Sequence, residues 1–127
     1  MYAFRVSDTA GWRLATAIAE RDTNALHSLF APAISFKGLT PGRAWESDSA
    51  EGAIDILLGS WFEPHDHIDE IVTLADGDLV ADTAQVIYRF NMTTPDGPRT
   101  AEQHVFYRTE GDQITYARAI CSGFRPL

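Results

Sequence analysis

Residues 99–124, RTAEQHVFYRTEGDQITYARAICSGF, decide the fold class. Residues 99–108 and 113–124 alternate between polar and apolar side chains and are rich in aromatic and branched residues, a pattern typical of β-strands. The EGD tripeptide between them has the composition of a tight turn. Strands joined by so short a turn pair antiparallel, so this segment predicts a β-hairpin.

Two further strand-like runs precede this hairpin. HIDEIVTL (67–74) and DTAQVIYRFNM (82–92) show the same two-residue period. DGD (76–78) and TPDGP (94–98) have the composition of the turns between successive runs. We therefore expect four strands that follow one another as an antiparallel meander.

The first half of the chain has a helical period instead. Apolar spacing predicts helices over about residues 9–20, 22–31 and 50–62, the second of them ending at Pro32. Their caps are assigned to Ser7 or Asp8, to Asp22, and to Asp48 or Ser49. Residues 33–39 predict a short strand, and TPGRAWESDS (40–49) predicts a loop. Helices in front of a meander predict a single α+β domain over residues 1–127, with the helices packed on one face of a curved sheet.

Composition excludes some classes of partner. The chain has 127 residues, of which 45% are hydrophobic, and a net charge of −8. Nucleic acids and anionic membranes are bound through clustered Lys and Arg, so we expect neither as a partner. The single cysteine, Cys121, excludes an internal disulfide. With no apolar run of signal-peptide or membrane-spanning length, we expect a soluble, cytoplasmic protein.

The alternation in residues 101–108 raises a question about His104. It places His104 on one strand face with Glu102, Phe106 and Arg108, and places Gln103 on the other. An imidazole among aromatic rings is either a core residue with a satisfied hydrogen bond or a group that faces a cavity and moves a proton. Both interpretations stay open on these residues alone.

The order of elements resembles the nuclear transport factor 2-like fold, and within it the SnoaL-like proteins. NALHSLFAPAISFKG (24–38) is similar to that family's helix running into its first strand. HDHIDEIVTLADGDLVADTAQVIYRF (65–90) and EQHVFYRTEGDQITYARAICSGF (102–124) are similar to its hairpin-rich second half. The resemblance implies a cone-shaped, curved, mixed sheet wrapped around three N-terminal helices, with an apolar pocket between sheet and helices. The group includes ketosteroid isomerase, polyketide cyclases, scytalone dehydratase and epoxide hydrolases.

The catalytic residues of these enzymes do not transfer as a set. Similarity of residues 104–114 to ketosteroid isomerase puts His104 in place of its oxyanion-stabilising acid. The isomerase's base would fall near Phe36 and that of the polyketide cyclases near Ala119, and neither side chain accepts a proton. Similarity to scytalone dehydratase implies a pocket histidine at His67. The first helix offers no convincing match for that enzyme's acidic partner.

His67 and His104 are therefore the candidate catalytic pair. Inward residues of the second and fourth strands of such a sheet can converge on one cavity, where a neutral imidazole acts as a base or a donor. Asp69 and Glu102 each lie two positions from one histidine and can orient it. The alternative is that each histidine bonds only to a backbone carbonyl or a neighbouring carboxylate.

Other residues are expected to bind the ligand or to pair two subunits. The ligand-binding candidates are Trp61, Tyr88, Phe36, Phe106, Glu102, Asp69, Ala119 and Cys121. Small side chains at Ala119 and Cys121 leave room for a pocket floor, or else for a closely packed helix. The other sheet face is assigned Gln103, Val105, Tyr107, Tyr116 and Arg118. The resemblance implies a homodimer through that outer face, and a solvated face is the alternative.

No metal or cofactor is expected. His65 and His67 share a strand face at a spacing of two, and His104 is a possible third zinc ligand. However, His65 falls in the loop before the strand, and the pockets of this family usually carry no metal.

Three functions remain open. The first is a cofactor-free isomerase, dehydratase or cyclase-type enzyme that acts on an apolar carbonyl compound through pocket histidines. The second is a non-catalytic binding module for a small hydrophobic ligand. The third is a dimeric structural or interaction protein whose cavity is filled by its own side chains.

Overall fold

The structure is a computed structural model that describes residues 8–127. Its helices are α1 (Ala10–Ala19), α2 (Thr23–Leu29) and α3 (Ala50–Asp55), and α3 continues into a π-helical turn, η1 (Ile56–Trp61). Its strands are β1 (Phe30–Thr40), β2 (Arg43–Ser47), β3 (His67–Asp76), β4 (Ala84–Thr94), β5 (Gly97–Glu110), β6 (Gln113–Cys121) and β7 (Arg125–Pro126).

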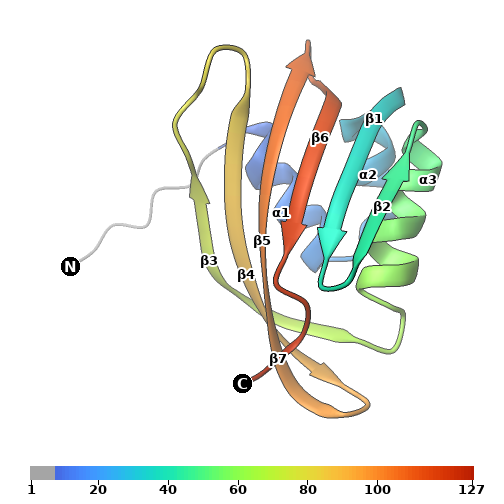
Figure 1. Cartoon of the computed structure of the whole chain (residues 1–127), viewed down its shortest axis with the longest axis vertical. Helices are drawn as coiled ribbons and strands as arrows, with labels where there is room; N and C mark the ends of the chain where they lie inside the picture. Colours follow the sequence, from blue (N-terminus) through green and yellow to red (C-terminus); the bar gives the residue numbers. More distant parts are fainter. Residues whose placement is uncertain (1–7) are drawn as a thin grey trace.

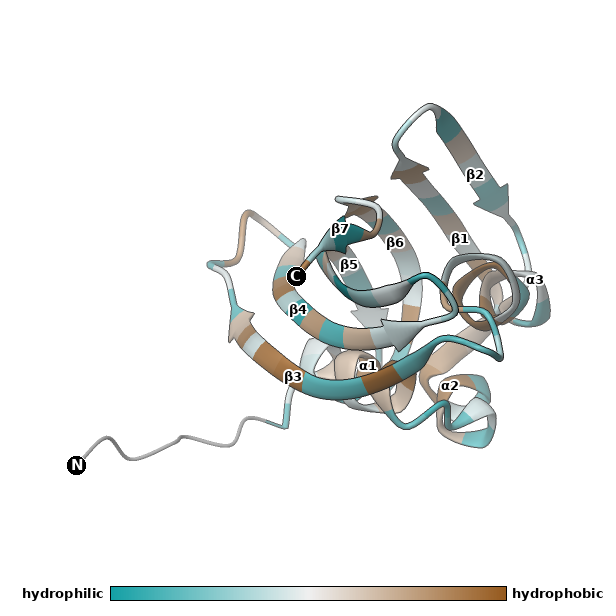
Figure 2. Ribbon diagram, turned by 90° about the horizontal axis from the view of Figure 1, so that it is seen from below, coloured by the Kyte–Doolittle hydropathy of each residue, from teal (hydrophilic) through white to brown (hydrophobic). Residues whose placement is uncertain are grey.

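The strands form one curved, mixed sheet in the order β2-β1-β6-β5-β4-β3, and β7 pairs with β5 (Figure 1). The β3–β6 meander is antiparallel throughout, as predicted, whereas β1 pairs with β6 in parallel. The helices lie behind the sheet in Figure 1. We call the face that packs against them the inner face and the opposite one the outer face. The end-on view in Figure 2 shows how strongly the sheet curves. The predicted α+β cone is confirmed.

Helix caps follow the sequence signals closely. The side chains of Asp22 and Ser49 accept hydrogen bonds from the N–H groups of Ala25 and Gly52, as expected of N-caps. Thr9 caps α1 in place of Asp8. The other cap candidate, Ser7, lies outside the described residues.

Two segments differ from the sequence predictions. Residues 43–47, predicted as a loop, form β2 and pair antiparallel with β1. The turn between them contains Gly42 at φ 79°, a conformation that favours glycine and here closes a hairpin. β1 begins at Phe30 and includes Pro32, which lies exposed where the β1–β6 register breaks. A proline is tolerated at such an irregularity.

The predicted assignment of the two faces of β5 is wrong, whereas Tyr116 and Arg118 of β6 lie on the outer face as expected. Val105 pairs with Ala119, and both side chains are buried on the inner face together with Gln103. His104 pairs with Ile120 on the outer face. Of the two β5 faces, the one with Glu102, His104 and Arg108 carries the charges. That face therefore lies toward solvent, because the helices cover the other one.

α1 lies close against the inner face because residue 11 is a glycine. The Gly11 N–H donates to the Tyr107 hydroxyl at 3.0 Å, and a Cβ at this position would overlap with Val86. Within residues 8–127, no helix combines the length and the apolar character needed to cross a membrane. The cytoplasmic location stays a prediction.

Candidate functional site

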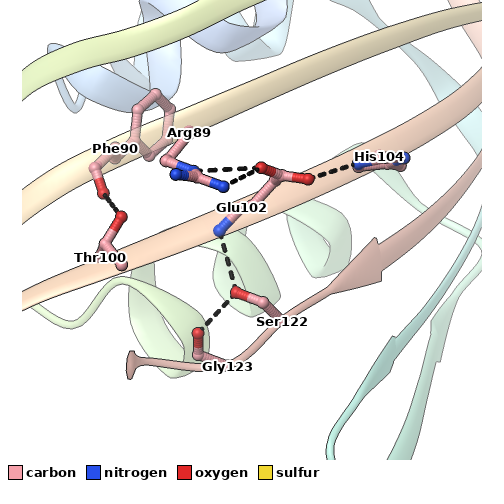
Figure 3. Close-up of polar contacts among 7 residues, drawn as sticks. All are labelled: Arg89, Phe90, Thr100, Glu102, His104, Ser122 and Gly123. Atoms are coloured by element: carbon pink, nitrogen blue, oxygen red, sulfur yellow. Dashed lines mark hydrogen bonds and ion pairs between the residues drawn. The ribbon is translucent and has the colours of Figure 1, made fainter. Parts of the chain in front are cut away.

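On the outer face, Glu102 forms a polar network with its neighbours (Figure 3). Arg89 donates from Nε and Nη2 to Glu102 Oε1 at 3.1 and 2.9 Å, and His104 Nε2 lies 2.7 Å from Glu102 Oε2. Ser122 Oγ accepts from the Glu102 N–H. The hydrogen bond from His104, followed by that from Arg89, lowers the pKa of Glu102 despite its partial burial. This partly exposed network holds His104 on the sheet surface.

The two candidate histidines do not face one cavity. His67 is exposed on β3, with Nε2 3.4 Å from Asp69 Oδ1. His67 pairs with Thr93 and His104 pairs with Ile87, so their positions differ by six residues along β4. At the rise of a β-strand this is about 20 Å. The predicted convergence is therefore wrong, although each histidine does have the neighbouring carboxylate that the sequence suggested.

The inner face carries a different polar group, the pair of Tyr88 and Gln103. These residues are cross-strand partners on β4 and β5, and both are fully buried. The Tyr88 hydroxyl donates to Gln103 Oε1 at 2.6 Å. Burial, and to a lesser extent Cys121, raises the pKa of the Tyr88 phenol far above its ordinary value. The phenol therefore stays protonated and fixes the orientation of the Gln103 amide.

Besides Arg21 Nη1, two buried donors near the inner face have no acceptor among the described residues. They are Gln103 Nε2 and Trp61 Nε1. An unpaired buried donor costs about 1–3 kcal/mol, so a native protein normally supplies a water, an ion or a ligand for it. Both therefore mark a place where an acceptor belongs.

Trp61 occupies the space that small residues leave on the inner face. A Cβ at Gly38 would overlap with the indole. The ring centroids of Phe36 and Trp45 lie 5.9 and 6.2 Å from that of Trp61. Gly38 thus lies beneath a packed side chain, and its cross-strand partner Ala119 is buried as well.

The predicted ligand-binding residues divide between the two faces. Those near the inner face are Phe36, Trp61, Tyr88, Ala119 and Cys121, all of them buried. Phe106 and Glu102 lie on the outer face, and Asp69 is exposed on β3. Gln103 was assigned to the outer face, so sequence reasoning missed it. Its signal was an amide in the otherwise apolar series Ala101, Val105 and Tyr107.

Two of the larger grooves on the described residues lie outside this interior. One, of about 720 Å³, runs between α1, α2 and β3 and includes Trp12, Leu29, Ile71 and Leu74. The other, of about 620 Å³, lies on the outer face and includes Leu39, Phe106 and Ile120. Glu63, His65 and Asp66 also bring one ligand atom each within 4.8 Å of the others. This cluster differs from the His65, His67 and His104 set that the sequence suggested.

Comparison with known proteins identifies the fold. No family model matches the chain, and no curated protein matches its sequence. A protein from Catenulispora acidiphila with a ketosteroid isomerase-like fold, solved in complex with trimethylamine, is similar with a TM-score of 0.65 and 15% identity, over 90% of this chain and 85% of that one. The chain has the nuclear transport factor 2-like fold.

Other structures with this fold agree. A proposed SnoaL-like polyketide cyclase from Mesorhizobium loti has a TM-score of 0.60 and 14% identity, over 91% of this chain and 98% of that one. A proposed isomerase from Bacillus subtilis has a TM-score of 0.67 and 11% identity, over 87% and 84%. At such identities the nuclear transport factor 2-like fold is shared, and the chemistry has to be argued from this chain's own residues.

Proposed function

We propose that this protein binds a small, largely apolar molecule that carries a hydrogen-bond acceptor, and that the Gln103 amide holds the acceptor. The observation that carries the proposal is the buried Gln103 Nε2 without a partner. Its orientation is fixed because Tyr88 occupies the amide oxygen. A carbonyl or ether oxygen would satisfy the amide, and the surrounding rings and aliphatic side chains would contact the apolar part of the ligand.

The chemistry of the interior favours binding over proton transfer. Among the described residues, the buried polar or charged side chains are Gln103 and Asp66, besides the phenols of Tyr88 and Tyr107 and the Cys121 thiol. Asp66 lies in the loop before β3, where it accepts from the Glu63 N–H. A general base must lie within hydrogen-bond reach of its proton, and on the inner face of β4–β6 no carboxylate or imidazole is present. This supports the binding module over the histidine-dependent enzyme.

The test uses a matched pair of probes, 2-acetylnaphthalene and 2-ethylnaphthalene, which differ in the ketone oxygen. A site built to donate a hydrogen bond rejects the analogue that lacks the acceptor. We expect the ketone to bind at least tenfold more tightly in calorimetry, and the preference to disappear in Gln103→Leu. Equal affinities in the wild-type protein would contradict the proposal.

The indole N–H signals of the tryptophans report where the probe binds. In ¹⁵N-labelled protein, the ketone should shift the Trp61 signal. A shift confined to Trp12 would instead place the probe in the groove between α1, α2 and β3, because Trp12 lines that groove. That result would overturn the assignment of the site to the interior.

A second proposal concerns the partner, because the outer face carries an exposed apolar row. Leu39, Ile120, His104 and Ile87 are successive cross-strand partners on β1, β6, β5 and β4. Leu39 and Ile120 are 53% and 54% exposed. Exposed apolar patches rimmed by polar groups mark interaction surfaces, which supports the expected homodimer.

Sedimentation tests this second proposal directly. Ile120→Lys should shift the protein from dimer to monomer. The matched control is Val72→Lys, because Val72 is similarly exposed, at 48%, and lies on β3 away from the row. A monomeric wild-type protein would refute the dimer.

A further inference from the structure

We propose that Trp61 is a gate: the π-helical turn η1 can move the indole off Gly38 and so give a ligand access to Gln103. The inference rests on the proposed function for what passes the gate. The movement itself is a property of the chain alone. Three features support this movement: the π-helical geometry of η1, the packing of the Trp61 indole, and the hydrogen bonds from Arg21 to η1.

The first feature is the helical geometry. η1 covers Ile56–Trp61, and the bond from the Phe62 N–H to the Leu57 oxygen at 2.9 Å has the wider spacing of a π-helix. Such turns are rare and concentrate at functional sites. Returning a π-turn to an α-helix shifts the register by one residue, or about 100° around the axis. The turn therefore has two discrete arrangements, and they direct Trp61 differently.

The second feature is that the packing of Trp61 is favourable for its rings but leaves its indole N–H unpaired. The indole packs on Gly38 and against Phe36 and Trp45, which favours the closed position. Its Nε1 is buried without an acceptor, which opposes that position. In the open position water would satisfy this donor. Closure is thus a balance of opposing contributions.

The third feature is Arg21, whose hydrogen bonds connect η1 to the segment between α1 and α2. Its Nη2 donates to the carbonyl oxygens of Leu58 and Phe62 at 2.9 and 2.6 Å, on either side of Trp61 in the sequence. Arg21 lies between α1 and α2 at φ 52°, a left-handed conformation that a non-glycine residue rarely adopts. This backbone directs a cation toward η1, and Arg21 acts as a latch on the closed gate.

The consequence concerns both access and size. In the closed position the indole lies on Gly38, so a ligand of the same size needs that space. Trp61 therefore limits the size of a ligand that can occupy this space together with the indole. Because the indole has to move before a ligand enters, ligand entry is slower than the diffusion limit.

The experiment uses 5-fluorotryptophan and ¹⁹F NMR on the full chain without ligand, with the Trp61 signal assigned from Trp61→Phe. Solvent contact is read from the shift between H₂O and D₂O. Arg21→Met removes the latch and keeps the length of the side chain. We expect the solvent-exposed form of Trp61 to increase at least tenfold. Arg13→Met, an exposed cation on α1, is the matched control and should change nothing.

Gly38→Ala provides a second, independent variant, because its Cβ would overlap with the indole. It should also expose Trp61. If both variants keep a single Trp61 signal without a solvent shift, the gate is refuted. That result leaves the ketone preference of the wild-type protein untouched. Conversely, a lost ketone preference with an intact gate refutes only the proposed function.

Discussion

Replacing Tyr88 and Gln103 one at a time and together should show that they act as one unit. Tyr88→Phe leaves the buried Gln103 Oε1 without its donor, which costs about 1–3 kcal/mol. Gln103→Leu leaves the Tyr88 hydroxyl unpaired, at a similar cost, but also removes the amide donor that already lacks an acceptor. The two single variants should therefore differ, with Gln103→Leu the milder.

The double variant removes every one of these polar atoms. Replacing both partners of a buried hydrogen bond with apolar groups of similar shape is nearly neutral or stabilising. We expect its free energy of unfolding in urea to lie within about 1 kcal/mol of the wild type, giving a coupling energy of at least about 1 kcal/mol. A double variant that loses the sum of both single effects would refute the reasoning.

Three further predictions follow from the fold. The pKa of Glu102 is lower in the folded chain, so the stability that Glu102 contributes is present above its ordinary pKa of 4.5 and is lost as the pH falls through the folded pKa. Glu102→Gln should therefore flatten the pH dependence of the unfolding free energy below pH 5. An unchanged pH profile would refute this. Gly11→Ala should destabilise by about 1–3 kcal/mol in urea, despite alanine's better helix propensity, because of overlap with Val86; a stabilised variant would show that α1 can shift away. Ser49→Ala should cost about 1 kcal/mol, because the N-cap hydrogen bond to Gly52 is lost; Ser60→Ala, on an exposed part of η1, is its control.

Much of the fold is predictable from local signals. The switch from a helical to a two-residue period separates the helices from the meander, and the turns at DGD, TPDGP and EGD fix the strand order. These are short-range effects, in which turn chemistry and periodicity act within a few residues. The parallel β1–β6 pair and the β2 hairpin depend on contacts far apart in the chain. The sequence alone predicted neither the parallel pair nor the hairpin.

Gln103 was missed through one error, the choice of which β5 face lies inward. The alternation itself was right, and it grouped Gln103 with Val105 and Tyr107. An aromatic and histidine-containing face suggested a pocket. However, Glu102 and Arg108 on that face would have to be desolvated, and that cost outweighs the burial of one ring at Phe106. The π-helical turn has no sequence signal that we recognise.

The most direct test of the account is the affinity ratio between 2-acetylnaphthalene and 2-ethylnaphthalene, measured by calorimetry in the wild type and in the Tyr88→Phe/Gln103→Leu variant. The account predicts a ratio of ten or more in the wild type and close to one in the variant. Urea unfolding of the variant confirms beforehand that it is folded. A ratio near one in both proteins would contradict the claim that the Gln103 amide donates a hydrogen bond to a ligand.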